Sequence, residues 1–286
     1  MATYSQTRAA GNVADDAAFR ALFKWFSDNM TTSGWVKTGD TGQVDWTTVT
    51  KPTVANTVAG YEVRESPTQS GYQKIYVKIE FGTGSAATYP AMWITLGTGT
   101  DGAGALTGTI TTRDQFFANV NVAVEDLLCV TDNHFTLMLQ GPQSGAGVAN
   151  AWLVVERWTT ADGNYETEGW TVVDCGGSIG FTQSMNATGA NTSFSGQALG
   201  YIPPSYSGSG GVVHVAPVMP NRPGAQYPLR AIAFIAIGNA GYGSTFSFAM
   251  FPGKTQTWRS CLGTTTVGGL NLSDIPANLS PVFRWE

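Results

Sequence analysis

The chain has 286 residues, and 12% of them are charged, about half the roughly 25% usual for soluble domains. Lys and Arg total 15 against 20 Asp and Glu, a net charge of -5, which argues against a basic groove for nucleic acid or a polybasic membrane surface. Aromatic residues make up 12% of the chain, and 35 residues are glycine, so the composition is that of a folded protein and excludes a disordered one.

The first residues show no apolar run behind a basic start, which is the mark of a secretory signal. No stretch reaches the ~18 consecutive apolar residues of a membrane span. We therefore expect the protein to be made and released in a cytoplasm, without membrane insertion. Cys129, Cys175 and Cys261 lie far apart and form no C-x-x-C pair, so we expect reduced, buried thiols.

Residues 13–30 carry the apolar spacing of an amphipathic helix, with large side chains every three or four residues. Asp15 and Asp16 suit the positive N-terminal end of the helix, and Ser33-Gly34 ends it. Such a stripe ordinarily packs on the protein's own sheet, and docking onto a partner subunit is the alternative. On that alternative, residues 1–45 form a helical attachment segment. The candidate contact residues on it are Phe19, Leu22, Phe23 and Phe26.

From residue 46 onward the apolar pattern changes to a period of two, which predicts half-buried β-strands. In residues 74–81, for example, Ile75, Val77 and Ile79 alternate with polar side chains. Residues 230–237 are apolar on both faces, which predicts a central strand between two covered surfaces. Strands are expected at 60–65, 74–81, 91–96, 135–140, 151–158, 170–175, 212–215, 230–237 and 246–251.

Glycine and proline mark the connections between these strands. The Asp-Gly pair at 162–163 predicts a hairpin, and the glycine-rich stretch 97–104 predicts an exposed loop. The segment 184–211 is rich in Asn, Ser, Gly and Pro and has no periodic pattern, which is typical of a contact arm or a domain junction. Tyr201 and Tyr206 within it complete the candidate partner-contact residues.

About a dozen strands, one helix and frequent turns indicate an all-β fold. We expect a β-sandwich or jelly-roll-like arrangement with one N-terminal amphipathic helix and long Gly/Ser/Pro-rich loops. The β-sandwich domain then spans residues 46–286, either as one unit or as two subdomains with a junction near 184–211.

The sequence offers little support for catalysis. His134 opens a strand and His214 lies in an apolar run, and no G-x-S-x-G motif presents a serine, so both are expected to be hydrogen-bonded structural residues. Glycoside hydrolysis requires two facing carboxylates, whereas Glu80 on a polar strand face and Glu156 beside Arg157 are expected to be solvated or paired. The other acidic residues considered for such a pair are Glu125, Asp126, Glu166 and Glu168.

Metal and nucleotide sites find equally little support. An oxygen-rich group after residue 160 allows calcium binding as an alternative, but its spacing fits no EF-hand loop and hairpin turns use the same residues. The glycine clusters at 82–84 and 97–99 lack the Lys-Ser/Thr ending of a phosphate loop. We therefore expect no cofactor and no metal. The oxygen-rich group consists of Asp162, Asn164, Glu166 and Glu168.

Several short segments, taken in order, resemble structural virion proteins of tailed bacteriophages. The start of such proteins has an amphipathic helix that leads into a "G-L-V-x-T-x-D-T-G-Q-I-D-W" stretch, to which residues 34–46, GWVKTGDTGQVDW, are similar. The resemblance covers roughly residues 1–170, and the chain's ending is also similar. The segments that carry it are 19–26, 34–46, 77–84, 92–104, 154–158 and 281–286.

This resemblance implies a structural subunit of a virion that belongs to the tail, the baseplate or a tail-fibre-associated part. It implies other virion proteins and further copies of this chain as partners, contact with a host surface glycan, assembly in the host cytoplasm, and no catalytic residues. A capsid decoration or head-to-tail collar protein is the alternative within the virion. A polysaccharide-binding module is a further alternative, and an enzyme such as a polysaccharide depolymerase is the least favoured.

Overall fold

The computed structural model describes most of the N-terminal half and parts of the C-terminal half. In these residues the protein is mostly β, with sheets of almost entirely antiparallel strands and one helix. The predicted all-β class is confirmed at this level. The described residues are 1–111, 113–117, 122–140, 150–160, 162–175, 182–183, 185–189, 198–202, 212–216, 230–235, 245–251, 254–260, 266–267 and 280–285.

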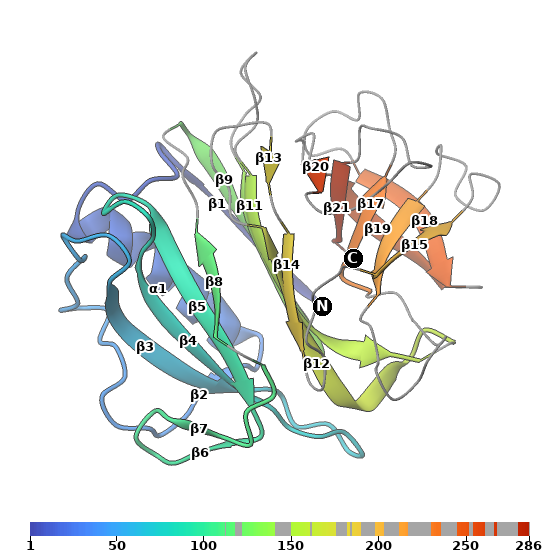
Figure 1. The fold of residues 1–286 in the computed structure, drawn as a ribbon, viewed down its shortest axis with the longest axis horizontal. Coiled ribbons are helices and arrows are strands. Elements are labelled where there is room, and N and C mark those ends of the chain that lie inside the picture. The colour runs from blue at the N-terminus through green and yellow to red at the C-terminus, as the bar shows by residue number, and fades with distance from the viewer. Residues whose placement is uncertain are drawn as a thin grey trace.

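The first sheet has six antiparallel strands in the order β1-β9-β10-β11-β12-β14 (Figure 1). β1 comes from the N-terminus and pairs with β9, with Ala2 opposite Val130. β11 and β12 form the hairpin predicted from the Asp-Gly pair, and Gly163 in its turn has the left-handed φ of 71° that favours glycine. The strands are β1 Ala2–Arg8, β9 Val124–Val130, β10 His134–Gln140, β11 Asn150–Thr159, β12 Tyr165–Cys175 and β14 Met185–Gly189.

The second sheet has five antiparallel strands in the order β2-β3-β4-β5-β8. The predicted alternation holds in β4, where Val77, Ile79 and Phe81 are fully buried. A small ribbon of β6 and β7 lies in the connection from β5 to β8. The strands are β2 Val36–Lys37, β3 Val58–Glu65, β4 Tyr76–Thr83, β5 Pro90–Gly97, β6 Gly99–Thr100, β7 Leu106–Thr107 and β8 Asp114–Phe117.

The C-terminal sheet has six antiparallel strands in the order β15-β16-β17-β21-β19-β18. β17 occupies an interior position in this sheet, as its apolar sequence predicts. β13 and β20 form a separate two-stranded parallel sheet. The strands are β13 Thr182–Gln183, β15 Ala198–Ile202, β16 Val212–Ala216, β17 Ile232–Ile235, β18 Thr245–Phe251, β19 Lys254–Ser260, β20 Thr266–Val267 and β21 Ser280–Arg284.

Helix α1 spans Asp16–Thr32 and starts three residues later than the apolar pattern predicts. The reason is the capping residue: the Asp15 carboxylate accepts a hydrogen bond of 2.8 Å from the backbone N–H of Ala18, which fixes the N-terminus there. The helix ends at Thr32 and is capped by Ser33, which precedes Gly34, whose φ of 89° few residues other than glycine adopt. No helix in the described ranges is both long enough and apolar enough to cross a membrane.

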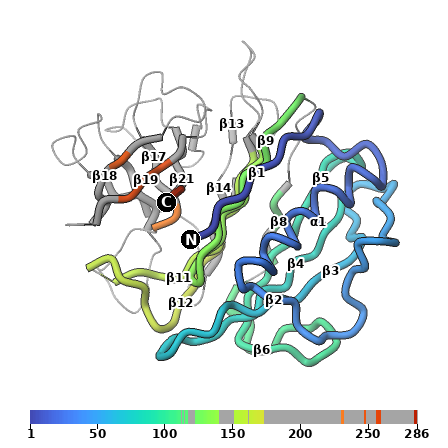
Figure 2. Tube along the Cα trace, turned by 180° about the vertical axis from the view of Figure 1, so that it is seen from behind, coloured from blue at the N-terminus to red at the C-terminus, as the bar shows by residue number. Residues whose placement is uncertain are grey.

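The apolar face of α1 belongs to one core that is shared with the first and second sheets. The ring of Phe26 lies 6.4 Å from that of Phe81 in β4 and 6.0 Å from that of Phe135 in β10, so the helix contacts both sheets. Figure 2 shows α1 beside the strands of the second sheet. The core residues of the helix are Phe19, Leu22, Phe23, Phe26 and Met30.

This packing corrects the candidate contact set on the helix. Phe19, Leu22, Phe23 and Phe26 are at most 2% exposed, so the expected packing on the protein's own sheets is what the structure contains. Docking of this face onto a partner subunit would require the four side chains to leave the core. Residues 1–45 are likewise no separate attachment segment, because they supply β1 to the first sheet and α1 to the shared core.

A buried ion pair ties α1 to β3. Glu62 and Arg64 are both fully buried, and the Arg64 guanidinium donates to Glu62 Oε2 from Nη2 at 2.7 Å and from Nε at 2.9 Å. Ser27 of α1 donates to Glu62 Oε1 at 2.8 Å, and Arg64 also donates to the backbone carbonyl of Trp35 at 2.7 Å. These partners satisfy the charges that burial would otherwise penalise.

The first sheet is buried on both faces in its central strands. On β10, Leu137 faces the shared core, while Met138 on the opposite face is equally buried. Ala231 and Trp258, which belong to the C-terminal part, are fully buried as well. Two covered faces explain why β9 has no alternation in its sequence, VEDLLCV, and could not be recognised from period two.

Two other segments differ from the sequence-based expectation. The stretch 97–104 is more ordered than an open loop, because β6 lies inside it and Gly104 is buried. The segment 184–211 contains β14, which pairs with β12, and β15, which pairs with the following strand β16. The chain passes from the first sheet to the C-terminal sheet between these two strands; the rest of this segment, including Tyr206, lies outside the described residues.

Candidate functional site

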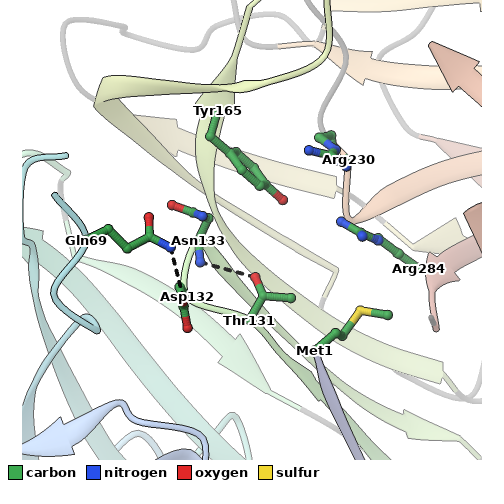
Figure 3. A pocket seen from close by; sticks show the side chains of 8 residues that line it. All are labelled: Met1, Gln69, Thr131, Asp132, Asn133, Tyr165, Arg230 and Arg284. Carbon is green, nitrogen blue, oxygen red and sulfur yellow. Dashed lines mark hydrogen bonds between the residues drawn. The ribbon is translucent and has the colours of Figure 1, made fainter. Parts of the chain in front are cut away.

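A polar pocket of about 240 Å³ lies where the first sheet, the loop after β3 and the C-terminal sheet meet (Figure 3). Met1 precedes β1, Tyr165 begins β12, and a turn between β9 and β10 supplies three further residues. Arg284 ends β21, and Arg230 lies two residues before β17. The lining residues are Met1, Gln69, Thr131, Asp132, Asn133, Tyr165, Arg230 and Arg284.

The two arginines are held side by side by the backbone of the C-terminal sheet. The backbone N–H of Arg284 donates to the carbonyl of Ala231 at 3.0 Å, which continues the pairing of β17 with β21. The guanidinium of Arg230 lies 5.0 Å from the centre of the Tyr165 ring, a cation–π distance. Figure 3 shows both arginine side chains at the same side of the pocket as Tyr165.

The carboxylate of Glu156 joins the first sheet to the C-terminal part at the backbone of the pocket residue Arg230. Its Oε1 accepts from the backbone N–H of Arg230 at 2.7 Å, and its Oε2 accepts from that of Ala231 at 3.0 Å. Glu156 is fully buried. Desolvation raises its pKa to about 7, although the two backbone donors and the positive charges of Arg230 and Arg284 oppose the increase.

A hydrogen-bonded chain continues from Glu156 into the first sheet. The Tyr165 hydroxyl lies 3.3 Å from Glu156 Oε1 and 3.2 Å from His134 Nδ1. His134 Nδ1 is also 2.9 Å from the hydroxyl of Thr131. Burial lowers the pKa of His134 well below 6.5, with the positive charges of Arg284 and Arg230 acting in the same direction, and burial raises the pKa of Tyr165. His134 is therefore neutral near pH 7 and hydrogen-bonded, and the hydrogen bonding agrees with the sequence-based prediction.

The expectation for Glu156 is wrong, because it is neither solvated nor paired with Arg157. Neighbouring residues of a strand point to opposite faces. The Arg157 guanidinium lies on the other face, 4.5 Å from the Trp170 ring, where it donates to the carbonyl of Gln73 at 2.9 Å. Glu80, in contrast, is paired, since it accepts a hydrogen bond of 2.5 Å from Arg113 Nε.

The remaining sequence candidates do not converge on one site. Asp126 is buried and bonded to Arg8 at the β1–β9 pairing, and burial raises its pKa despite that partner. Asp162 accepts hydrogen bonds from Thr160 and Asn164 within the hairpin turn. Across the described ranges, no group of three or more His, Cys, Asp or Glu side chains is placed to hold a metal ion.

Of the residues singled out in the sequence, Cys129 is fully described, whereas Tyr201 and His214 are placed only in part. Cys129 is a buried thiol outside any disulfide, as predicted, and burial raises its pKa to about 12. The backbones of Tyr201 and His214 lie in β15 and β16, whereas their side chains fall outside the description. The contact role of Tyr201 and Tyr206 therefore stays a prediction.

A second hydrogen-bonded cluster joins segments 34–46 and 92–104, two of those that carry the virion-protein resemblance. We call it the motif clamp; it consists of Asp40, Tyr61, Thr100 and residues 101–104. The Asp40 carboxylate is buried and accepts hydrogen bonds from the Thr100 hydroxyl and, at 2.8 Å, from the backbone N–H of Gly104. These bonds lower the pKa of Asp40, although desolvation, the largest single influence, acts to raise it.

Tyr61 closes the motif clamp from the second sheet. Its hydroxyl donates to the carbonyl of Thr41 at 2.5 Å and lies 3.2 Å from that of Ala103. Thr41 also donates its backbone N–H to the carbonyl of Gly102 at 2.9 Å. Segments 34–46 and 92–104, about sixty residues apart in the chain, thus form one surface, on which residues 101–103 are exposed.

Comparisons with protein-family models, curated proteins and solved structures find no match for this chain. The function is therefore argued from the pocket, the motif clamp and the sequence itself.

Proposed function

We propose that the chain is a structural subunit of a bacteriophage virion, in the tail, the baseplate or a tail-fibre-associated part, and that it acts by contact and not by catalysis. The observation that carries the proposal is the motif clamp. Two segments that resemble phage virion proteins are bonded to each other through Asp40 and Tyr61, and their exposed tip, residues 101–103, is available to a neighbouring subunit.

Several buried charged side chains are bonded to other groups of the same chain, which supports a contact role. Glu62 and Arg64 bind each other and α1, and Glu156 binds backbone N–H groups. Neutral His134 lies beside Tyr165, without a serine or cysteine nucleophile at hydrogen-bond distance in the described structure other than the Cys129 sulfur at 3.8 Å. Because burial raises the pKa of that thiol to about 12, it is not a reactive nucleophile near neutral pH.

The arrangement of the sheets fits assembly in a virion. We interpret the first and second sheets, which share one core, as the two layers of a β-sandwich closed on one side by α1. β1 and β14 end the first sheet, and β2 and β8 end the second. Such edges carry unpaired backbone groups, and association with other virion proteins or with further copies of this chain is one way to cover them.

A pair of matched variants tests this role. Ala103→Arg adds a long charged side chain at the exposed tip of the motif clamp, and Ala17→Arg adds the same side chain at an exposed position of α1. Each variant is supplied during particle assembly in place of the wild-type chain, and purified particles are assayed for the subunit by quantitative mass spectrometry. We expect Ala103→Arg to reduce incorporation strongly, while Ala17→Arg is incorporated at the wild-type copy number.

Thermal melting of both isolated variants shows beforehand that each is folded. Normal incorporation of Ala103→Arg would overturn the motif clamp as a contact surface. Absence of the wild-type chain from purified particles would overturn the virion role itself.

A further inference from the structure

We propose that the pocket beside Tyr165 binds a carboxylate-bearing sugar, whose carboxylate is received by the guanidinium groups of Arg230 and Arg284. This inference does not rest on the virion role, because it follows from the chemistry of the pocket and is tested on the isolated chain. It assigns a ligand class to a site that the assembly role leaves unused.

In the described part of the chain neither guanidinium group is hydrogen-bonded to a carboxylate, although both are close enough to Glu156 for their charges to oppose the rise of its pKa. Nε of Arg230 and Nε of Arg284 are buried, and neither has a hydrogen-bond partner in the described part of the chain. A buried donor without an acceptor is costly. A ligand carboxylate entering between the two side chains would supply acceptors to both, in the forked geometry that guanidinium and carboxylate groups share.

Glu156, the nearest buried carboxylate, does not fill this role. Its two oxygens accept the backbone N–H groups of Arg230 and Ala231, at 2.7 and 3.0 Å, and not the arginine side chains. Glu156 therefore fixes the backbone that carries Arg230, and the guanidinium groups remain directed to the pocket (Figure 3).

The other lining residues match the hydroxyl groups of a sugar ring. Gln69 donates to the Asp132 carboxylate at 2.9 Å, and this pair forms a polar wall with Thr131 and Asn133. The described lining has two guanidinium groups against one carboxylate, so its charge favours an anion. A volume of about 240 Å³ is below the roughly 300–1,000 Å³ of pockets for drug-sized ligands and suits a single ring.

Titration calorimetry of the full chain with three small probes tests the assignment. Glucuronate carries the ring and the carboxylate, glucose carries the ring alone, and acetate carries the carboxylate alone. We expect saturable binding of glucuronate, none of glucose, and weaker binding of acetate. Arg230→Gln and Arg284→Gln should each weaken glucuronate binding about tenfold or more, as loss of a charge-assisted hydrogen bond does.

Arg113→Gln is the matched control, because Arg113 directly precedes β8 and pairs with Glu80 away from the pocket. It should leave glucuronate binding unchanged. Absence of saturable glucuronate binding to the wild-type chain, or unchanged binding in both pocket variants, would overturn the proposal. Equal binding of acetate and glucuronate would overturn its sugar part. The wild-type comparison of glucuronate with glucose decides the case if either arginine variant fails to fold.

Discussion

Replacing Glu156 by glutamine removes a titratable group from the joint between the first sheet and the C-terminal part of the chain. The wild-type carboxyl group is fully buried, and desolvation raises its pKa from 4.5 to about 7. Glutamine has nearly the same shape but does not titrate. We therefore expect the wild-type chain and Glu156→Gln to differ in how their stability depends on pH.

The sign of the difference follows from where the proton binds more tightly. Because the folded pKa is raised, the folded chain holds this proton better than the unfolded chain. The associated stabilisation is fully present below pH 4.5 and is lost as the pH rises through about 7. The rise in pKa between the unfolded and the folded chain corresponds to about 3 kcal/mol of the free energy of unfolding, at about 1.4 kcal/mol for each unit of pKa.

Other groups near the joint also titrate, which is why the variant is needed. Burial lowers the pKa of His134 below 6.5, so its stabilising contribution is present above 6.5 and is lost as the pH falls. That trend opposes the trend of Glu156. Both chains contain His134, Tyr165, Arg230 and Arg284, so the difference between the two chains isolates Glu156.

The measurement is urea unfolding of both chains at several pH values between about 5 and 8. The stability advantage of the wild-type chain over Glu156→Gln should fall by about 2–3 kcal/mol from the acid to the alkaline end of this range. A difference that stays constant across the range would refute the buried, high-pKa carboxyl group, because a carboxyl group whose pKa is unshifted or lowered titrates below about pH 5.

Two further predictions concern features that lie away from the pocket. Arg64→Met should lower the free energy of unfolding by about 3–5 kcal/mol, because it leaves the Glu62 carboxylate buried without its guanidinium partner; urea unfolding measures it. Gly104→Ala should lower the melting temperature more than Gly102→Ala. Both glycines have left-handed φ values, 91° and 82°, but only at Gly104 would an added Cβ meet Tyr61, at 2.3 Å from its hydroxyl oxygen.

Each of these predictions has its own control. The double variant Arg64→Met with Glu62→Gln should be more stable than Arg64→Met alone, because the buried charge is removed with its partner. A loss below about 1 kcal/mol in Arg64→Met would contradict the role of the ion pair. Equal melting temperatures for the two glycine variants would contradict the close packing of Tyr61 in the motif clamp.

The helix and the half-buried strands could be predicted from the sequence because their signal is local. The apolar stripe of α1 and the alternation in β4 each repeat within a single element. β9 could not be recognised in this way, since burial on both faces removes the alternation. β1 was also missed, because an edge strand composed of small and polar residues has no periodic apolar signal.

The pocket could not be predicted because its residues come from distant parts of the chain. Arg230 and Arg284 become neighbours only through the pairing of β17 with β21. The sequence favours a pair between Glu156 and Arg157 because the two residues are neighbours in the chain. Strand geometry places their side chains on opposite faces of the sheet, so they do not pair. A polar residue inside the apolar run of β11 was the one available signal of a buried contact.

Electron microscopy of purified particles that carry a labelled form of the chain tests the central claim most directly. A label inserted at the exposed residues 101–103 would disturb the proposed contact surface. The label is therefore attached at Ala17, an exposed position of α1. The account predicts label at a fixed, symmetric position on the tail or its appendages. Particles that are complete but carry no label would contradict it.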